Sequence, residues 1–464
     1  MSGRALAALV LLCAAAASAQ QEEAPAAAGE PAQDGAPVVA AEVDVDDEAL
    51  EEAAQAATQN ATAAPGYTPT AANPAQPALR VTGYIDVGFA RAQGDGTSFA
   101  RGDTRAPLDY GVDTFAPMVN SRGDVASTNS SGRFTNGFLP RSAGIAGKPS
   151  FLLNTVDADI RYQPIQPLFL FARTQLLPRF GAADGEATRV LVEQAFARIA
   201  PFSSEEFTLT IGKADSVFGI EYLENEANLR TGITPSLIAR YTTGQSLGAK
   251  AFYRVQIPAL WAAVSLNVAA TSGGTLVESL QPQSASLTGT PVGSGRAGLE
   301  LNLPGIEVKL GASAFYGPRN DQHDPDVRQR GFGADARLIV RWLSLAAEWV
   351  KIDQFAGAAD KDNGLGRQTL VSGFHADGAY VTASLSLPLG LGPLKKLTPY
   401  GRYARRHAQF EGFVPITVDA ITAGARLDLW DSLAVKAEGL FNREVEGAPN
   451  VPNDVFTSSL VFSW

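Results

Sequence analysis

The sequence has a single cysteine among its 464 residues, and that residue, Cys13, lies inside an apolar N-terminal segment. A chain with no further cysteine can form neither a disulfide framework nor a thiolate metal site. Three histidines are little material for catalysis, and we find neither zinc-ligand spacing nor a glycine-rich phosphate loop. We therefore expect no catalytic residues, no cofactor and no metal site.

Long hydrophobic runs are also missing. Beyond the N-terminal segment, no stretch approaches the roughly 18 to 20 apolar residues that a helix needs to cross a bilayer. The formal net charge of -11 argues against nucleic acid as a partner, because phosphate neutralisation requires a basic face. Helical membrane spans and nucleic-acid binding are thus excluded by the sequence.

The first 19 residues have the three parts of a secretory signal. Arg4 supplies the positive charge, residues 5–17 the apolar core, and Ala17-Ser18-Ala19 a small-x-small cleavage site before Gln20. We interpret residues 1–19 as a signal peptide, so the protein is expected to leave the cytoplasm.

Residues 20–78 differ in composition from everything that follows. Eleven carboxylates between residues 20 and 77 meet no Lys or Arg, and Tyr67 is the one aromatic residue there. Such a segment cannot bury enough apolar surface to offset its ordering entropy. We predict an acidic, Ala- and Pro-rich disordered segment, whereas residues 79–464 are nearly neutral, with 36 basic and 37 acidic residues.

From Leu79 onward, apolar and polar residues alternate with a period of two, which predicts β-strands with one apolar face. Sixteen segments follow this pattern: 79–91, 151–163, 168–177, 189–200, 206–213, 245–257, 260–270, 296–303, 306–316, 331–342, 345–353, 374–387, 397–407, 416–429, 433–444 and 454–464. Most are close to the 9 to 11 residues that span a membrane as a tilted strand. Glu193 and His375 fit neither parity, which a β-bulge would explain.

The connections between these segments alternate in length. Seven are short, at 164–167, 201–205, 258–259, 304–305, 343–344, 390–396 and 430–432, and eight are long and polar. An even number of strands lets the first and last pair, and closure is required because lipid tolerates no unpaired backbone edge. The sequence therefore predicts an all-β, transmembrane antiparallel β-barrel of sixteen strands in the outer membrane of a Gram-negative-type envelope.

The last segment adds a separate signal. Phe456, Leu460, Phe462 and Trp464 share one parity, and the chain stops on an aromatic residue. This ending resembles the terminal signature that outer-membrane barrels present to their assembly machinery. The resemblance implies that this machinery and outer-membrane lipid are partners of the chain.

The parity opposite to the apolar one should face the lumen, and it carries twelve cations against nine anions. Because a sixteen-strand barrel is too wide for side chains to fill, we expect these groups to line an aqueous channel with a weak anion preference. The predicted pore-lining residues are Arg80, Asp157, Arg161, Arg173, Lys250, Arg254, Lys309, Arg337, Arg402, Arg406, Arg426 and Lys436. Mutual salt bridges that stiffen the wall are the alternative for many of them.

The long connection at residues 214–244 carries many apolar residues, so we expect it to pack against something. The stretches Thr208 to Lys213, Val217-Phe218-Gly219 and Pro235-Ser236-Leu237-Ile238 to Gly248 resemble the strand, constriction loop and returning strand of the phosphate-selective porin O/P family. The resemblance implies a homotrimer of sixteen-strand barrels and a loop that folds back into the lumen.

The predicted constriction loop departs from the cationic ladder of some members of that family. Its charged residues are Asp215, Glu221, Glu224, Glu226, Arg230 and Arg240, so it is net acidic and phosphate selectivity is not expected. Facing Lys250, Arg254, Arg402 and Arg406, these acids would set up a transverse electric field. Alternatively, the acids bind neighbouring loop backbone.

Together these features predict a porin, a non-enzymatic channel through which small hydrophilic solutes and inorganic ions diffuse passively. Two alternatives remain open. One is an outer-membrane barrel enzyme, either a protease or a phospholipase; the other is a secreted adhesion or envelope-structural β protein.

Overall fold

A computed structural model describes residues 78–92, 127–128, 134–136, 150–177, 189–202, 206–215, 217–224, 226–242, 245–272, 291–318, 328–355, 374–410, 415–446 and 454–464. The signal peptide at 1–19 and the acidic segment at 20–78, apart from Ala78, therefore lie outside the described residues. No helix formed by the described residues combines the length and the apolar character that crossing a membrane requires.

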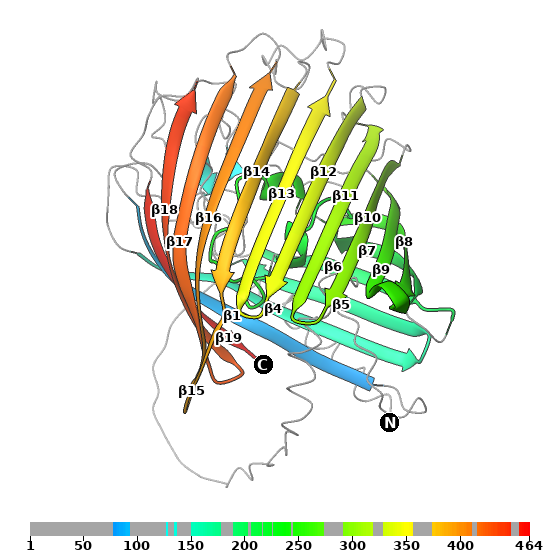
Figure 1. The fold of residues 1–464 in the computed structure, drawn as a ribbon, viewed down its shortest axis with the longest axis horizontal. Helices are drawn as coiled ribbons and strands as arrows, with labels where there is room; N and C mark the ends of the chain where they lie inside the picture. Colours follow the sequence, from blue (N-terminus) through cyan, green and yellow to red (C-terminus); the bar gives the residue numbers. More distant parts are fainter. Residues whose placement is uncertain are drawn as a thin grey trace, which may run out of the picture. The chain divides into compact units, whose positions relative to one another are not determined.

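The described residues form mainly β-strands (Figure 1). The strands are β1 (Ala78–Ala92), β2 (Ser127–Thr128), β3 (Phe134–Asn136), β4 (Ser150–Ile165), β5 (Leu168–Leu177), β6 (Arg189–Ile199), β7 (Phe207–Asp215), β8 (Gln245–Ile257), β9 (Ala262–Thr271), β10 (Val292–Leu303), β11 (Ile306–Pro318), β12 (Arg328–Val340), β13 (Leu343–Gln354), β14 (Phe374–Leu385), β15 (Leu387–Leu391), β16 (Leu394–Phe410), β17 (Ile416–Leu429), β18 (Leu433–Glu446) and β19 (Val455–Ser463). Three short helices accompany them: η2 (Glu221–Glu224), α3 (Ala239–Thr242) and η3 (Pro258–Leu260).

The large sheet closes on itself. Strand β1 pairs antiparallel with β4 on one side and with β19 on the other, and every other neighbouring pair is antiparallel as well. Strands β14 and β15 are one strand interrupted at Ser386, because both pair with β16 in the same register. The barrel therefore has sixteen spanning strands, as the sequence predicts, and it leaves no open edge that lipid would have to cover.

Three strand limits differ from those expected. Strand β10 begins at Val292, four residues earlier, and β13 begins at Leu343, so the preceding turn is formed by Arg341 and Trp342. The connection expected at 390–396 is much shorter, because Leu391 already pairs with Leu394. Val292 and the small residues at 293–295 gave no polar signal for the start of β10. The other two limits include the charged residues Arg341, Lys395 and Lys396, so charge did not separate turn from strand there.

The bulge expected at Glu193 is present, and the one expected at His375 is not. The ladder between β5 and β6 slips between Arg173 and Thr174, which leaves Glu193 as the extra residue. The ladder between β13 and β14 runs past His375 without a slip. His375 instead lies on the outer face, beside Asp353.

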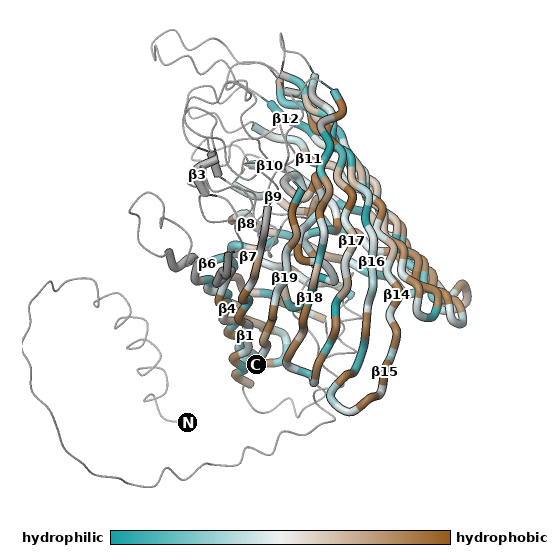
Figure 2. Tube along the Cα trace, turned by 90° about the vertical axis from the view of Figure 1, so that its left-hand side faces the viewer, coloured by the Kyte–Doolittle hydropathy of each residue, from teal (hydrophilic) through white to brown (hydrophobic). Residues whose placement is uncertain are grey.

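Side chains on the outer face of the barrel are predominantly apolar. On β8, Leu247 is 53% and Tyr253 is 50% exposed, whereas Phe252, of the opposite parity, is 6% exposed. Figure 2 shows the resulting alternation of hydrophobic and hydrophilic residues along the strands. Exposing such a surface to water would cost about 25 cal/mol per Å², so hydrocarbon is the solvent that suits it.

Candidate functional site

The connection between β7 and β8 lies inside the barrel. Its described residues, 217–224 and 226–242, contact inward-facing side chains of β1, β5, β11, β13 and β18. In Figure 1, the green helical turns of this segment lie behind strands β12 to β14. Since these strands stand on different sides of the closed sheet, the segment crosses the lumen; we call it the constriction loop.

A lysine and a glutamate two residues apart on β18 hold the middle of the constriction loop. The ammonium of Lys436 donates to the carbonyl oxygens of Ala227 and Arg230, both at 2.5 Å, and to that of Gly232 at 3.1 Å. The carboxylate of Glu438 accepts the backbone N–H of Ile233 at 2.8 Å. Both side chains are 1% exposed; Lys436 binds loop carbonyl groups, and Glu438 also accepts hydrogen bonds from the hydroxyl groups of Thr234 and Tyr400.

Two further arginines of the same wall bind loop carbonyl groups. Arg402 of β16 donates to the carbonyl oxygens of Thr234 at 2.9 Å and Pro235 at 2.7 Å. Arg426 of β17 donates to those of Asn228 at 2.8 Å and Arg230 at 3.1 Å. Charge-assisted bonds of this kind are about twice as strong as neutral ones, which fixes the loop against β16–β18.

The first half of the loop is held by strands that flank this wall on its two sides, β1 and β5 beyond β18 and β11 and β13 before β16. Glu226 accepts a hydrogen bond from the Tyr84 hydroxyl and forms an ion pair with Arg173, both at 2.7 Å. The backbone N–H of Ile220 donates to Glu348 at 2.8 Å. The ring of Phe218 meets that of Phe315 edge to face at 4.9 Å. The apolar residues of this segment therefore pack inside the barrel, as their number in the sequence suggests.

Hydrogen bonds between residues of the loop also stabilise it. Glu221 accepts hydrogen bonds from the backbone N–H of Ser236 at 2.6 Å and from its hydroxyl at 2.5 Å. Burial raises the pKa of Tyr222 above its ordinary value and lowers that of Arg230, although nearby negative charge opposes the latter shift. The loop thus has a partly dry interior of its own.

A cavity of about 110 Å³ remains between the constriction loop and strands β10 to β16. Its charged lining residues are Glu221, Glu224, Arg230, Arg296, Lys309, Asp335, Arg337 and Arg402. Five cationic side chains therefore face three anionic ones. Thr382, Ser384, Tyr380 and Tyr400 also line this cavity, together with the apolar residues Ile220, Leu223 and Ala346.

Most of these charges are paired across the wall. Arg296 binds Asp335 with both nitrogens, at 2.6 and 3.1 Å, and Lys309 lies 2.6 Å from Glu307. Arg337 pairs with Glu224 of the loop. Such pairing leaves a small positive excess and no isolated cation among the charged residues lining this cavity.

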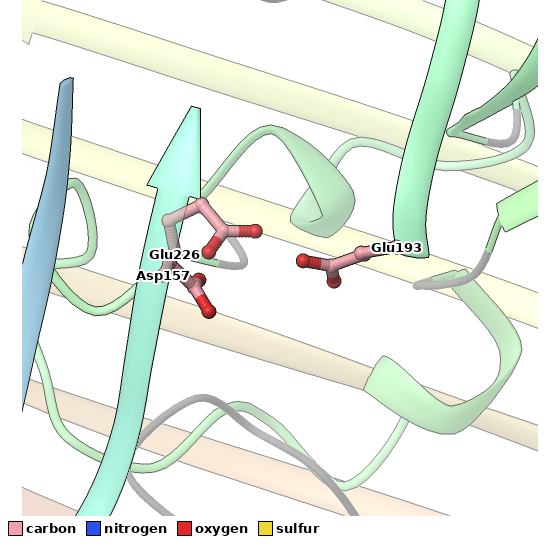
Figure 3. Close-up of side chains that lie close together, drawn as sticks. All are labelled: Asp157, Glu193 and Glu226. Atoms are coloured by element: carbon pink, nitrogen blue, oxygen red, sulfur yellow. The ribbon is translucent and has the colours of Figure 1, made fainter. Parts of the chain in front are cut away.

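Three buried carboxylates converge where the loop passes β4 and β6 (Figure 3). Asp157, Glu193 and Glu226 each bring one oxygen within 4.8 Å of the others. Oxygen donors of this kind suit a hard divalent cation. Arg173 already supplies positive charge there, since it binds both Asp159, at 2.6 Å, and Glu226.

Aromatic rings also face the lumen, which the parity rule did not predict. Phe169, Phe171 and Phe196 pack together, with ring centroids between 5.1 and 6.5 Å apart. The guanidinium of Arg198 lies 5.3 Å from the centroid of Phe196. The cation–π contact explains why apolar rings tolerate an inward position.

The predicted site residues lie at different places in the structure. Arg173, Glu221, Glu224, Glu226, Arg230, Lys309, Arg337, Arg402, Arg426 and Lys436 lie at the constriction or against it. Arg406 lies 3.5 Å from the Tyr241 hydroxyl, and Asp157 belongs to the carboxylate cluster.

The remaining residues lie outside the loop. Asp215 is the last residue of β7 and receives hydrogen bonds from Gln194 at 2.8 Å and, at its carbonyl oxygen, from Lys250 at 2.8 Å. Arg254 pairs with Glu300 at 2.5 Å, and Arg161 with Asp159 at 3.3 Å. Arg80 is exposed at the turn end of β1, and the side chain of Arg240 is outside the described residues.

Arg296 and Arg198 were not among the predicted pore-lining residues. Arg296 is the first residue of the predicted strand 296–303 and shares its parity with Glu300, which binds Arg254, so the alternation could have assigned it to the lumen. Arg198 shares the inward parity of Phe196, and alternation alone does not tell which parity of such a strand faces the lumen.

No protein-family model matches the sequence, and no curated protein matches it. Solved structures do resemble the fold. The outer membrane channel DcaP of Acinetobacter baumannii has 8% identity and a TM-score of 0.50 over 84% of this chain and 99% of its own. The anion-selective porin from Comamonas acidovorans has 9% identity and a TM-score of 0.48 over 84% and 100%. OmpT, an outer membrane protein of Vibrio cholerae, has 9% identity and a TM-score of 0.45 over 84% and 98%.

The fold is that of an outer-membrane β-barrel. Sixteen closed strands with an apolar outer face place the chain in the outer membrane. By the usual arrangement of such barrels, the strand ends joined by short turns are the periplasmic ends.

Proposed function

We propose that this protein is a porin through which small hydrophilic solutes and inorganic ions diffuse down their gradients. The observation that carries the proposal is the cavity between the constriction loop and β10–β16, whose lining combines eight charged residues with threonine, serine and tyrosine residues and a few apolar ones. A packed core would hold apolar side chains at these positions. The lining offers water and ions replacement hydrogen bonds along the lumen.

A weak anion preference is part of the proposal. The cavity lining has two more cations than anions, and several of its cations already bind carboxylates. A strongly selective channel would need unpaired cations to replace the hydration of an anion. We therefore expect passage of many small solutes and no preference for phosphate over chloride.

The predicted homotrimer and assembly through the C-terminal strand remain proposals as well. In support of the latter, Trp464 closes the barrel: its backbone N–H and carbonyl exchange 3.1 Å hydrogen bonds with Gly83. Chemical cross-linking of the protein in membranes, followed by electrophoresis, would reveal a three-fold species if the trimer forms.

Single-channel recording in a planar bilayer tests the function. We expect stepwise ohmic conductance in KCl, and under a tenfold KCl gradient a reversal potential of the sign that indicates chloride preference. Phosphate added at equal activity should not block the chloride current. A protein that inserts and passes no current would contradict the proposal, and a reversal potential of opposite sign would contradict its anion preference.

A barrel enzyme remains the rival proposal, and the two described histidines bear on it. His407 contacts the Thr417 hydroxyl at 2.9 Å, and His375 contacts Asp353 at the same distance. Both lie on the outer face and away from the cavity, so they favour no reaction in the lumen. An assay of peptide and phospholipid hydrolysis on the same preparation separates the two proposals.

A further inference from the structure

The outer face of the barrel changes from apolar to charged near the loop ends of β12 to β18, that is, the strand ends that lead into the long connections. Outward-facing positions there are charged: Arg330, Lys351, Asp353, His375, Asp377, Arg405, His407, Asp419 and Arg443. They form cross-strand rows, since Lys351 faces Asp377 and Asp377 faces His407. We call this set the outer collar.

At Asp353 and Asp419 the outer collar presents cations and shelters the acids that bind them, whereas the third acid, Asp377, is exposed. Arg330 and His375 each bind Asp353 at 2.9 Å, and both cationic side chains are 47% exposed while the carboxylate is 7% exposed. Arg405 binds Asp419 at 3.2 Å, with exposed fractions of 50% and 17%. At these two sites a ligand that approaches from outside the barrel therefore meets guanidinium and imidazole groups first.

Large aromatic side chains mark the level just below the outer collar. Phe332 stands opposite Lys351, and Trp349, Tyr403 and Phe441 also point outward, each between 42% and 49% exposed. Such aromatics gather where hydrocarbon gives way to headgroups. The cations directly beyond them are consequently at the level of the headgroups of the outer leaflet.

The neighbouring outer face has no such collar. At the loop ends of β8 to β11 the outward-facing described residues are apolar or small, for example Leu247, Ala270, Gly293 and Tyr316. If the charges of β12 to β18 only avoided hydrocarbon, all loop ends at that level would need them. Lys213 of β7, opposite Leu247, is a single outward cation on that side, whereas cross-strand rows of outward charges occur among the described residues on β12 to β18. This concentration indicates a specific neighbour.

We propose that the outer collar binds the phosphate groups of a phosphorylated glycolipid in the outer leaflet. Arginine presents a planar pair of donors that matches phosphate oxygens, and its stem can lie along the acyl chains. Arg330 is further fixed by the Phe355 ring, 5.3 Å from its guanidinium carbon. The collar lies outside the lumen, so this lipid site is independent of the proposed channel function.

Binding of bisphosphorylated lipid A to the full-length protein in detergent, followed by native mass spectrometry, tests the proposal. We expect the double variant Arg330→Gln with Arg405→Gln to lower the affinity about tenfold, as loss of two basic side chains at a charged lipid surface implies. The matched variant Lys213→Gln removes an outward cation of β7 and should leave the affinity unchanged. Equal affinity of the double variant and the unaltered protein would overturn the proposal.

Two further variants separate lipid binding from a folding defect. Arg330→Lys with Arg405→Lys keeps the charge and should retain most of the affinity. Asp353→Asn removes the carboxylate that competes for Arg330 and His375, so it should strengthen binding, which damage to the barrel could not do. Weaker binding by Asp353→Asn would contradict the proposal.

The last experiment varies the lipid instead of the protein. Dephosphorylated lipid A should bind at least about tenfold more weakly if two phosphate contacts are lost. Equal binding of that lipid, or complete displacement of lipid A by millimolar inorganic phosphate, would show that the collar is not a lipid phosphate site. Channel conductance, measured on the same variants, should not change.

Discussion

Two sides of the lumen use their positive charges in different ways. On β16–β18, Lys436 and Arg426 donate to backbone carbonyl groups of the constriction loop, although Arg426 also binds Asp428 at 2.7 Å. On β10–β12, Arg296 and Arg337 bind carboxylates beside the cavity. We call the first side the anchoring wall and the second the cavity wall. The difference teaches that a cation inside a barrel is not necessarily available to a solute.

Accessibility explains the difference. Lys436 is 1% exposed and has three carbonyl partners, so an ion in transit cannot reach it. The Arg337 side chain is 23% exposed, and its partner Glu224 is 38% exposed. Charges on the cavity wall therefore act on solutes, whereas Lys436 and Arg426 of the anchoring wall determine where the loop lies. Arg402 of β16 does both, since it binds loop carbonyl groups and also lines the cavity.

The largest effect is expected from Lys436→Met. The substitution leaves three buried carbonyl groups without their donor, and we expect a loss of about 3 kcal/mol in the free energy of unfolding. Released from the anchoring wall, the loop should also give a larger and noisier single-channel conductance. Heat-modified migration on a gel measures the stability, and bilayer recording measures the conductance.

Lys309→Met is the matched control on the cavity wall. Its partner Glu307 is 30% exposed and can be hydrated, so the stability should change by less than about 1 kcal/mol. If both lysine variants lose the same stability, the distinction between the two walls is wrong.

A smaller effect is expected where the loop approaches β13. Gly219 has a φ of +78°, and a Cβ built there would lie 2.3 Å from the Glu348 carboxylate. Gly219→Ala should therefore cost more than the roughly 1–2 kcal/mol of a left-handed residue. Gly305→Ala has the same φ with nothing within 4 Å, so the difference in unfolding free energy between the two variants isolates the contact. Equal losses would mean that the loop moves away from β13 without cost.

The sixteen strands could be predicted because lipid and water impose a strict two-residue period. Leu247, Tyr253 and Val255 face hydrocarbon while Lys250 and Arg254 face inward, and the closed sheet places them as the period requires. The bulge at Glu193 was also visible, because it breaks the period. The strands and the bulge follow from each residue and its near neighbours in the sequence, without contacts between distant residues.

The role of each inward cation could not be predicted in the same way. Lys436 binds Ala227, which is 209 positions away in the sequence, and alternation carries no information on such pairs. Arg402 was expected to face the loop acids across open lumen, yet it binds the carbonyl groups of Thr234 and Pro235. The expected alternative, loop acids bound to loop backbone, holds for Glu221 and Ser236. An irregular loop offers backbone groups in directions that no periodic rule specifies.

Ion selectivity should respond to the cavity wall and not to the anchoring wall. Arg337→Gln removes one of the two excess positive charges at the cavity, so we expect about half of the anion preference to be lost if selectivity follows the net lining charge. Arg426→Gln is the matched change on the anchoring wall and should leave the reversal potential unchanged. A shift of the reversal potential by Arg426→Gln alone would reverse the assignment of the walls.

Glu224→Gln gives the smallest expected effect and the most specific one. It removes the carboxylate that pairs with Arg337, which raises the positive excess at the cavity and should increase the anion preference. Because the Debye length falls from about 10 Å at 0.1 M salt to about 3 Å at 1 M, the increase should appear in dilute KCl and fade in concentrated KCl. An increase that persists at high salt would instead indicate that the loop has moved and widened the cavity, since screening does not alter the width of a channel.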